Sequence, residues 1–111
     1  MKSRIVYEDV TYIKTQTRIQ GYEFDWDFFV FDASGNEVTS HTIAQLKFAR
    51  KGSSDIVLQK NGTLSGNMAS FTISANDFDE SGDYHYQLVI KETDKKKAIA
   101  LGVLQLLSKI E

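Results

Sequence analysis

Apolar and polar residues alternate along most of this chain with a period of two, which is the pattern of half-buried β-strands. The clearest case is the segment 22–32, where every second residue from Phe24 to Val30 is apolar and shares one face. The opposite face carries Asp25, Asp27, Phe29 and Phe31. Similar alternation predicts further strands at 5–7, 12–14, 46–50, 56–59, 68–74 and 84–92. Gly, Asn, Asp and Ser mark the turns between them, because the chain has no proline.

Residues 98–107 are apolar on every side, so periodicity alone does not decide between a helix and a strand. Leu and Ala favour a helix. Gly102 would weaken a helix, and the polar tip at 93–97 after a strong strand predicts an antiparallel return. A strand that is apolar on both faces is either central in its sheet or covered by a neighbouring subunit. The candidate interface residues on this strand are Leu104, Leu106 and Leu107.

Two turn signals stand close together after residue 59. Asn61-Gly62 is a strong signal for a tight turn, because both residues tolerate positive φ. Ser65-Gly66-Asn67 offers a second turn a few residues later. The sequence therefore predicts a hairpin here but leaves its register open.

Residues 80–86 have the pattern of the corner that precedes strand F in immunoglobulin-like sandwiches, where a tyrosine hydroxyl bonds back to the backbone. Tyr84 fills that position, and Gly82 permits the sharp approach. Tyr86 takes the place of the second disulfide cysteine of antibody domains. With about seven to eight strands at regular spacing, the prediction is an immunoglobulin-like antiparallel β-sandwich, all-β and a single domain over 1–111. Its predicted core includes Trp26, Phe24, Phe28, Tyr86 and Leu88.

The composition is that of a globular protein, with 41% hydrophobic and 25% charged residues in 111. The net charge of −2 lacks the basic excess that nucleic-acid binding requires. The run Lys95-Lys96-Lys97 is short and lies near acids, so we expect it to be a solvated hairpin tip. No apolar run approaches the roughly 20 residues of a membrane helix. The N-terminus has no apolar signal segment. We therefore expect neither nucleic acid nor a membrane among the partners.

The residues that carry chemistry do not fall into a recognisable catalytic or metal-binding motif. The chain has no cysteine, which excludes disulfides, thiolate metal sites and cysteine nucleophiles. Residues 77–82 match the first half of an EF-hand loop, but the twelfth position is Leu88, which cannot bind calcium. His41 and His85 are far apart in sequence, and no Gly-x-Ser-x-Gly turn occurs. We expect no enzyme activity, no cofactor and no bound metal.

A series of segments carries a resemblance to a known family. In order they are 21–24, 32–35, 46–48, 61–62, 68–73, 81–88 and 102–104, which together span most of the chain. In these the chain resembles the N-terminal domain of phage baseplate upper proteins of the BppU type. The resemblance implies an immunoglobulin-like module that anchors receptor-binding parts to a phage tail through its surfaces. In that family the domain begins a longer protein, whereas this chain ends at Glu111. We expect either a piece of such a protein or a small tail protein.

Two hypotheses about function follow. The first is a virion structural protein of a phage or prophage, made in the bacterial cytoplasm without a signal peptide. It would act in the tail or baseplate through contacts with other baseplate proteins or with copies of itself. The alternative is a carbohydrate- or ligand-binding sandwich, which would use exposed aromatic rings and carboxylates. The groups available for that role are Tyr7, Tyr12, Phe29, Phe31, Asp25 and Asp27.

Overall fold

The computed structural model describes residues 1–7, 10–92 and 95–110, with the backbone alone at 92 and 95–98. These residues form ten strands and no helix. In chain order the strands are β1 (Lys2–Val6), β2 (Thr11–Tyr12), β3 (Gln16–Ile19), β4 (Phe24–Phe31), β5 (His41–Arg50), β6 (Ile56–Asn61), β7 (Thr63–Ser65), β8 (Met68–Ile73), β9 (Gly82–Glu92) and β10 (Lys95–Leu107). Of the hairpin tip predicted at 93–97, residues 93–94 lie outside the described residues, and the backbone of 95–97 already belongs to β10, paired with β9.

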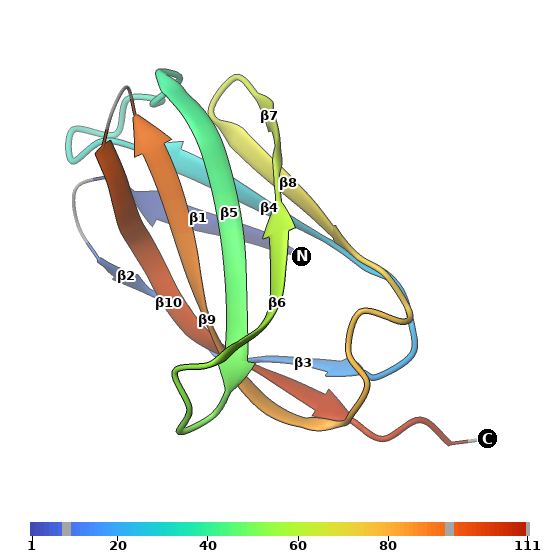
Figure 1. The fold of residues 1–111 in the computed structure, drawn as a ribbon. Coiled ribbons are helices and arrows are strands. Elements are labelled where there is room, and N and C mark those ends of the chain that lie inside the picture. Colours follow the sequence, from blue (N-terminus) through green and yellow to red (C-terminus); the bar gives the residue numbers. More distant parts are fainter. Residues whose placement is uncertain (8–9, 93–94, 111) are drawn as a thin grey trace.

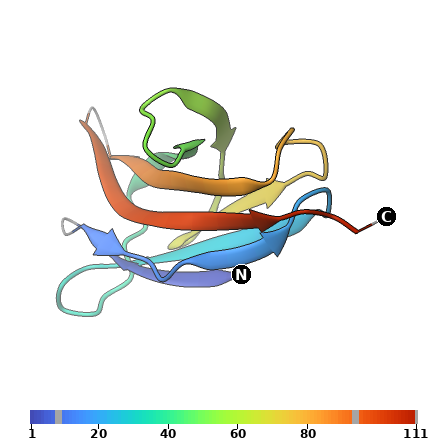
Figure 2. The same ribbon diagram turned by 90° about the horizontal axis from the view of Figure 1, so that it is seen from below.

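The strands form two sheets that pack face to face, as the view in Figure 2 shows along their edges. The back sheet has four strands in the order β1-β4-β8-β7 (Figure 1). The front sheet has six, with the path β2-β10-β9-β5-β6 and β3 also paired with β10. The orders β1-β4-β8-β7 and β10-β9-β5-β6 correspond to A-B-E-D and G-F-C-C′ of the immunoglobulin sandwich. The predicted all-β sandwich is confirmed.

Two details of the sheets differ from the prediction. The structure has ten strands rather than seven or eight, because β3 and β7 contain one apolar residue each and so show no alternation. The sheets are also mixed rather than purely antiparallel. β1 pairs parallel with β4, and both β2 and β3 pair parallel with β10. All three parallel pairs involve the N-terminal part of the chain, which leaves the back sheet after Val6 and joins the front sheet at Thr11.

The inner faces of both sheets meet in one apolar core. Trp26 on β4 and Tyr86 on β9 touch across it in a T-shaped arrangement, with ring centroids 4.7 Å apart. β4 and β9 correspond to strands B and F, which a disulfide joins in antibody domains. An aromatic pair therefore stands where those domains have a covalent link. Phe28 and Leu88 are fully buried beside it, and Phe24 is half-buried at the margin of the core.

Tyr86 also accounts for the glycine in β10. Gly102 pairs with Tyr86 in the β9–β10 ladder, and the phenol occupies the space that a side chain at 102 would need. Any larger residue at 102 would push the ring out of the core. Burial raises the pKa of Tyr86 well above its ordinary value, so the phenol is neutral there.

The tight turn predicted at Asn61-Gly62 is wrong, because this dipeptide is a crossover between the sheets. β6 ends at Asn61 in the front sheet, and β7 begins at Thr63 in the back sheet. A Cβ at Gly62 would come within 2.8 Å of the Phe71 ring. The glycine is needed for close passage over that ring and not for a turn.

The hairpin turn lies instead at Gly66-Asn67, the second of the two predicted signals. Ser65 of β7 pairs with Met68 of β8, and Gly66 has the positive φ of +60° that the turn requires. Asn67 is buried, and its side-chain amide donates to the carbonyl oxygen of Val30 at 3.2 Å. That contact fixes the turn against β4.

A group of polar contacts holds the corner that precedes β9. The Tyr84 hydroxyl donates to the backbone carbonyl of Glu80 at 2.7 Å, which is the geometry of a tyrosine corner. Arg50 at the end of β5 pairs with the Glu80 carboxylate and donates to the Ser81 carbonyl at 3.1 Å. Its guanidinium also lies 5.0 Å from the centre of the Tyr84 ring. Gly82, with a φ of +130°, leaves the space that this guanidinium occupies. We call these five residues the corner cluster.

The periodicity of residues 98–107 does not decide between a helix and a strand. In the structure these residues belong to β10, in the interior of the front sheet. β10 pairs with β9 on one side and with β2 and β3 on the other. Leu104 and Leu106 are only 0% and 3% exposed and belong to the core. The prediction that these two form a contact surface is wrong, because they face the back sheet. Leu107 is 47% exposed and lies beside Ile19 of β3.

Candidate binding site

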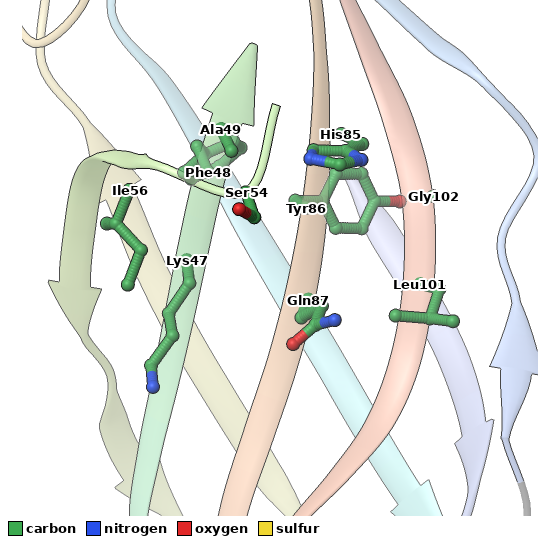
Figure 3. Close-up of a pocket in the computed structure, with 10 residues that line it drawn as sticks. All are labelled: Lys47, Phe48, Ala49, Ser54, Ile56, His85, Tyr86, Gln87, Leu101 and Gly102. Carbon is green, nitrogen blue, oxygen red and sulfur yellow. The ribbon is translucent and has the colours of Figure 1, made fainter. Parts of the chain in front are cut away.

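A hollow opens on the outer surface of the front sheet, over β5, β9 and β10 (Figure 3). Its volume is about 420 Å³. The side chains that give it chemical character are Lys47, Ser54, Ile56, His85, Gln87 and Leu101. They come from four strands and one loop, so the sheet must be assembled before the hollow exists.

Strand register explains the floor of the hollow. Lys47, Gln87 and Leu101 form one row across β5, β9 and β10, because each is paired with its neighbour in the ladder. In the next row the small side chain of Ala49 stands between Ile56 and His85. Neighbours in such rows have Cβ atoms only about 5 Å apart. The low Ala49 between taller side chains gives the surface its depth.

The connection between β5 and β6 forms a wall above this floor. It turns at Gly52, which has a φ of +88°, and the amide of Ser53 bonds to the Arg50 carbonyl at 2.9 Å. The Ser53 hydroxyl accepts from the Asp55 amide at 3.1 Å. The Nε2 atom of His85 lies 2.6 Å from the Ser53 carbonyl oxygen. Because a carbonyl only accepts, this nitrogen carries the hydrogen, and the bond ties the loop to β9.

The residues that line the hollow include a cation but no anion among those described. The Lys47 ammonium, the Gln87 amide and the Ser54 hydroxyl supply hydrogen-bond donors, and none of the described residues that line the hollow has a carboxylate. The ion pairs found among the described residues are Arg50–Glu80 and Lys60–Asp77, so neither uses Lys47. Ile56 and Leu101 add apolar walls. The site is suited to bind a group that is both anionic and partly apolar.

The six groups considered for sugar binding do not all share one surface. Asp25, Asp27, Phe29 and Phe31 share the outer face of β4 in the back sheet. Tyr12 is 79% exposed but belongs to β2 in the front sheet, and Tyr7 packs against the core. The Arg4 guanidinium covers the Phe31 ring at 4.2 Å. None of these side chains lines the hollow.

The acidic stretch that resembles half of an EF-hand is engaged in folding contacts. Asp77 accepts from the Ser74 amide at 2.7 Å and pairs with Lys60 at 2.7 Å. Glu80 pairs with Arg50 in the corner cluster. In the part of the chain that the structure describes, no three His, Cys, Asp or Glu side chains are placed to hold a metal ion.

Sequence reasoning missed the hollow, although part of its signal was present. Alternation in 46–50 and 84–92 correctly predicts that Lys47, His85 and Gln87 face outward. What the pattern does not contain is the fold-back of the β5–β6 loop, which depends on a bond between residues 32 positions apart.

The strand order, the tyrosine corner and the inter-sheet core define the class of the protein as an all-β, immunoglobulin-like sandwich. Among solved structures, the fold is similar to the N-terminal domain of phage TP901-1 ORF48, with a TM-score of 0.54 and 6% sequence identity. The match covers 96% of this chain and 98% of that chain. ORF48 is the baseplate upper protein BppU, so the predicted resemblance is confirmed at the level of the fold.

The other comparisons gave no relatives. No protein-family profile matches the sequence, and no curated protein matches it significantly. The described residues also contain no helix long and apolar enough to cross a membrane.

Proposed function

We propose that this chain is a structural component of a phage or prophage particle, located in the tail or baseplate and acting through contacts with other proteins there. The observation that carries the proposal is the fold likeness to the N-terminal domain of TP901-1 ORF48. Because 96% of this chain and 98% of that chain are covered, the likeness concerns a whole domain rather than a common hairpin. On this proposal the protein is made in the bacterial cytoplasm and ends in the virion.

The chemistry of the hollow supports binding rather than catalysis. The Nε2 atom of His85 bonds to a backbone carbonyl and not to a nucleophile, which is unlike the base of a catalytic pair. Among the described residues, no carboxylate lines the hollow to act as acid or base. A lasting protein contact buries roughly 1,000 Å² or more, so the hollow would be one part of a larger contact surface. Tail assemblies are symmetric, so we expect several copies in each particle.

Incorporation into particles tests the proposal directly. Phage particles are induced from the bacterium that encodes the chain, purified on a density gradient and analysed by quantitative mass spectrometry. We expect the chain to co-purify in a constant ratio to tail proteins, and immunogold labelling to place it on the tail. An abundant cytoplasmic protein serves as the control for contamination. Presence in the lysate but absence from purified particles would show that the proposal is wrong.

A further inference from the structure

We propose that the hollow on the front sheet binds the carboxylate side chain, glutamate or aspartate, of a neighbouring protein in the assembly. This inference rests on the proposed function, because it names the chemistry of one contact that a tail component would make. It concerns the surface of β5, β9 and β10 described above and not the corner cluster.

Charge is the first argument. The chain as a whole is acidic, with a net charge of −2, yet the lining that the structure describes contains a lysine and no carboxylate. Lys47 is half-buried, and neither ion pair found among the described residues includes it. An ammonium in a partly closed site gains most from an anion, since the lower local dielectric strengthens the attraction.

The arrangement of donors is the second argument. Gln87 is paired with Lys47 in the ladder, and its side chain lies between those of Lys47 and Leu101, with the amide nitrogen on the Leu101 side (Figure 3). The Ser54 hydroxyl belongs to the wall on the other side of the same hollow. A carboxylate has two oxygens and accepts several hydrogen bonds, so its chemistry matches a lining that offers donors.

The apolar walls favour a carboxylate side chain over a phosphate. Leu101 lies in the same row as Lys47 and Gln87, and Ile56 borders the hollow on the other side. These side chains suit the methylenes of a glutamate or aspartate and the apolar residues around it. A phosphate has no such apolar part and is typically recognised by arginine forks or by several cations. The lining, as far as the structure describes it, contains one lysine and no arginine.

A peptide titration followed by NMR tests the inference. The probe is acetyl-Leu-Glu-Leu-amide, added to the isotope-labelled protein and compared with the same peptide carrying Gln in place of Glu. We expect shifts concentrated at Lys47, His85, Gln87 and Leu101, and binding of the Gln peptide to be weaker by about fivefold. In the Lys47→Gln variant this preference should disappear. Lys91→Gln, which removes the same charge from β9 outside the hollow, should keep it.

Several outcomes would overturn the inference. Equal binding of the two peptides, shifts outside the hollow, or a preference that survives in Lys47→Gln would each do so. Inorganic phosphate that binds as tightly as the Glu peptide would assign the hollow to phosphate instead. Concentration-dependent self-association that disappears in Lys47→Gln would assign it to a second copy of the chain. Lys47→Arg keeps the charge and should keep the preference, which separates loss of charge from damage to the fold. Failure here leaves the test of particle incorporation untouched.

Discussion

Two cations on β5, Arg50 and Lys47, lie in opposite surroundings. Arg50 meets a carboxylate, a backbone carbonyl and an aromatic ring within the corner cluster. Lys47 lines the hollow, and none of the other lining residues in the described part of the chain is acidic. The difference indicates different uses of similar charges on one strand. The corner cluster uses its charge to stabilise the fold, whereas the hollow leaves its charge available to another molecule.

The largest expected effect is at Gly82. Gly82→Ala should lower the free energy of unfolding by about 2–3 kcal/mol, because its φ of +130° strains an L-residue and the new methyl displaces Arg50. Urea denaturation followed by circular dichroism measures this. Gly35→Ala is the matched control, since Gly35 also has a positive φ, +87°, but nothing lies within 4 Å of its added methyl. Equal losses at the two positions would contradict a specific role for the corner cluster.

Removal of one hydroxyl from the corner cluster should cost less. Tyr84→Phe keeps the ring and deletes only the hydrogen bond to Glu80, so we expect a loss of about 1–2 kcal/mol. Tyr12→Phe deletes a hydroxyl from an exposed ring and should change stability by less than about 0.5 kcal/mol. The two variants are compared in the same denaturation experiment. If the Tyr84→Phe and Tyr12→Phe proteins were equally stable, the tyrosine-corner hydrogen bond would not contribute to stability.

The same phenol should respond to alkaline pH. Burial raises the pKa of Tyr84 above its ordinary value of 10.0, with the Arg50 charge opposing the shift. A raised pKa in the folded state adds stability that is fully present below pH 10 and declines as the pH rises further. Ultraviolet absorbance of phenolate should therefore show Tyr84 ionising later in the wild type than in urea. Identical titration in the folded and unfolded protein would contradict this.

The smallest effect is expected in the hollow. Lys47→Gln should change the free energy of unfolding by less than about 0.5 kcal/mol, because the side chain makes no ion pair among the described residues. Arg50→Gln should cost about 1 kcal/mol through lost packing and hydrogen bonds, although its pairing with Glu80 is largely exposed. Thermal melts of the two variants measure the difference. A larger loss for Lys47→Gln than for Arg50→Gln would reverse the comparison.

Local sequence signals predicted the long strands and the position of the corner, because both depend on neighbours within a few residues. They failed where a distant side chain decides. Asn61-Gly62 and Gly66-Asn67 are both good turn sequences, and the choice depends on the Phe71 ring that packs against Gly62. Residues 98–107 are apolar on both faces, and the prediction that they form a strand is confirmed. Of the two explanations for an all-apolar strand, the central position in the sheet applies, because β2 and β3 pair with the edge of β10 opposite β9.

The hollow could be predicted only in part for the same reason. Alternation gives the outward direction of Lys47 and Gln87, but the register that aligns them with Leu101 requires three paired strands. The wall of the hollow depends on the bond between His85 and the loop carbonyl of Ser53. Such contacts form only in the assembled sandwich, so the alternation of apolar and polar residues in the sequence does not reveal them.

The aromatic pair between the sheets has a practical consequence. Trp26 is the only tryptophan in the chain, is fully buried, and stands 4.7 Å from Tyr86 of the opposite sheet. Its fluorescence therefore comes from a single position at the junction of the two layers. A red shift of that emission would report the moment at which the layers part and water reaches the indole, without any added label.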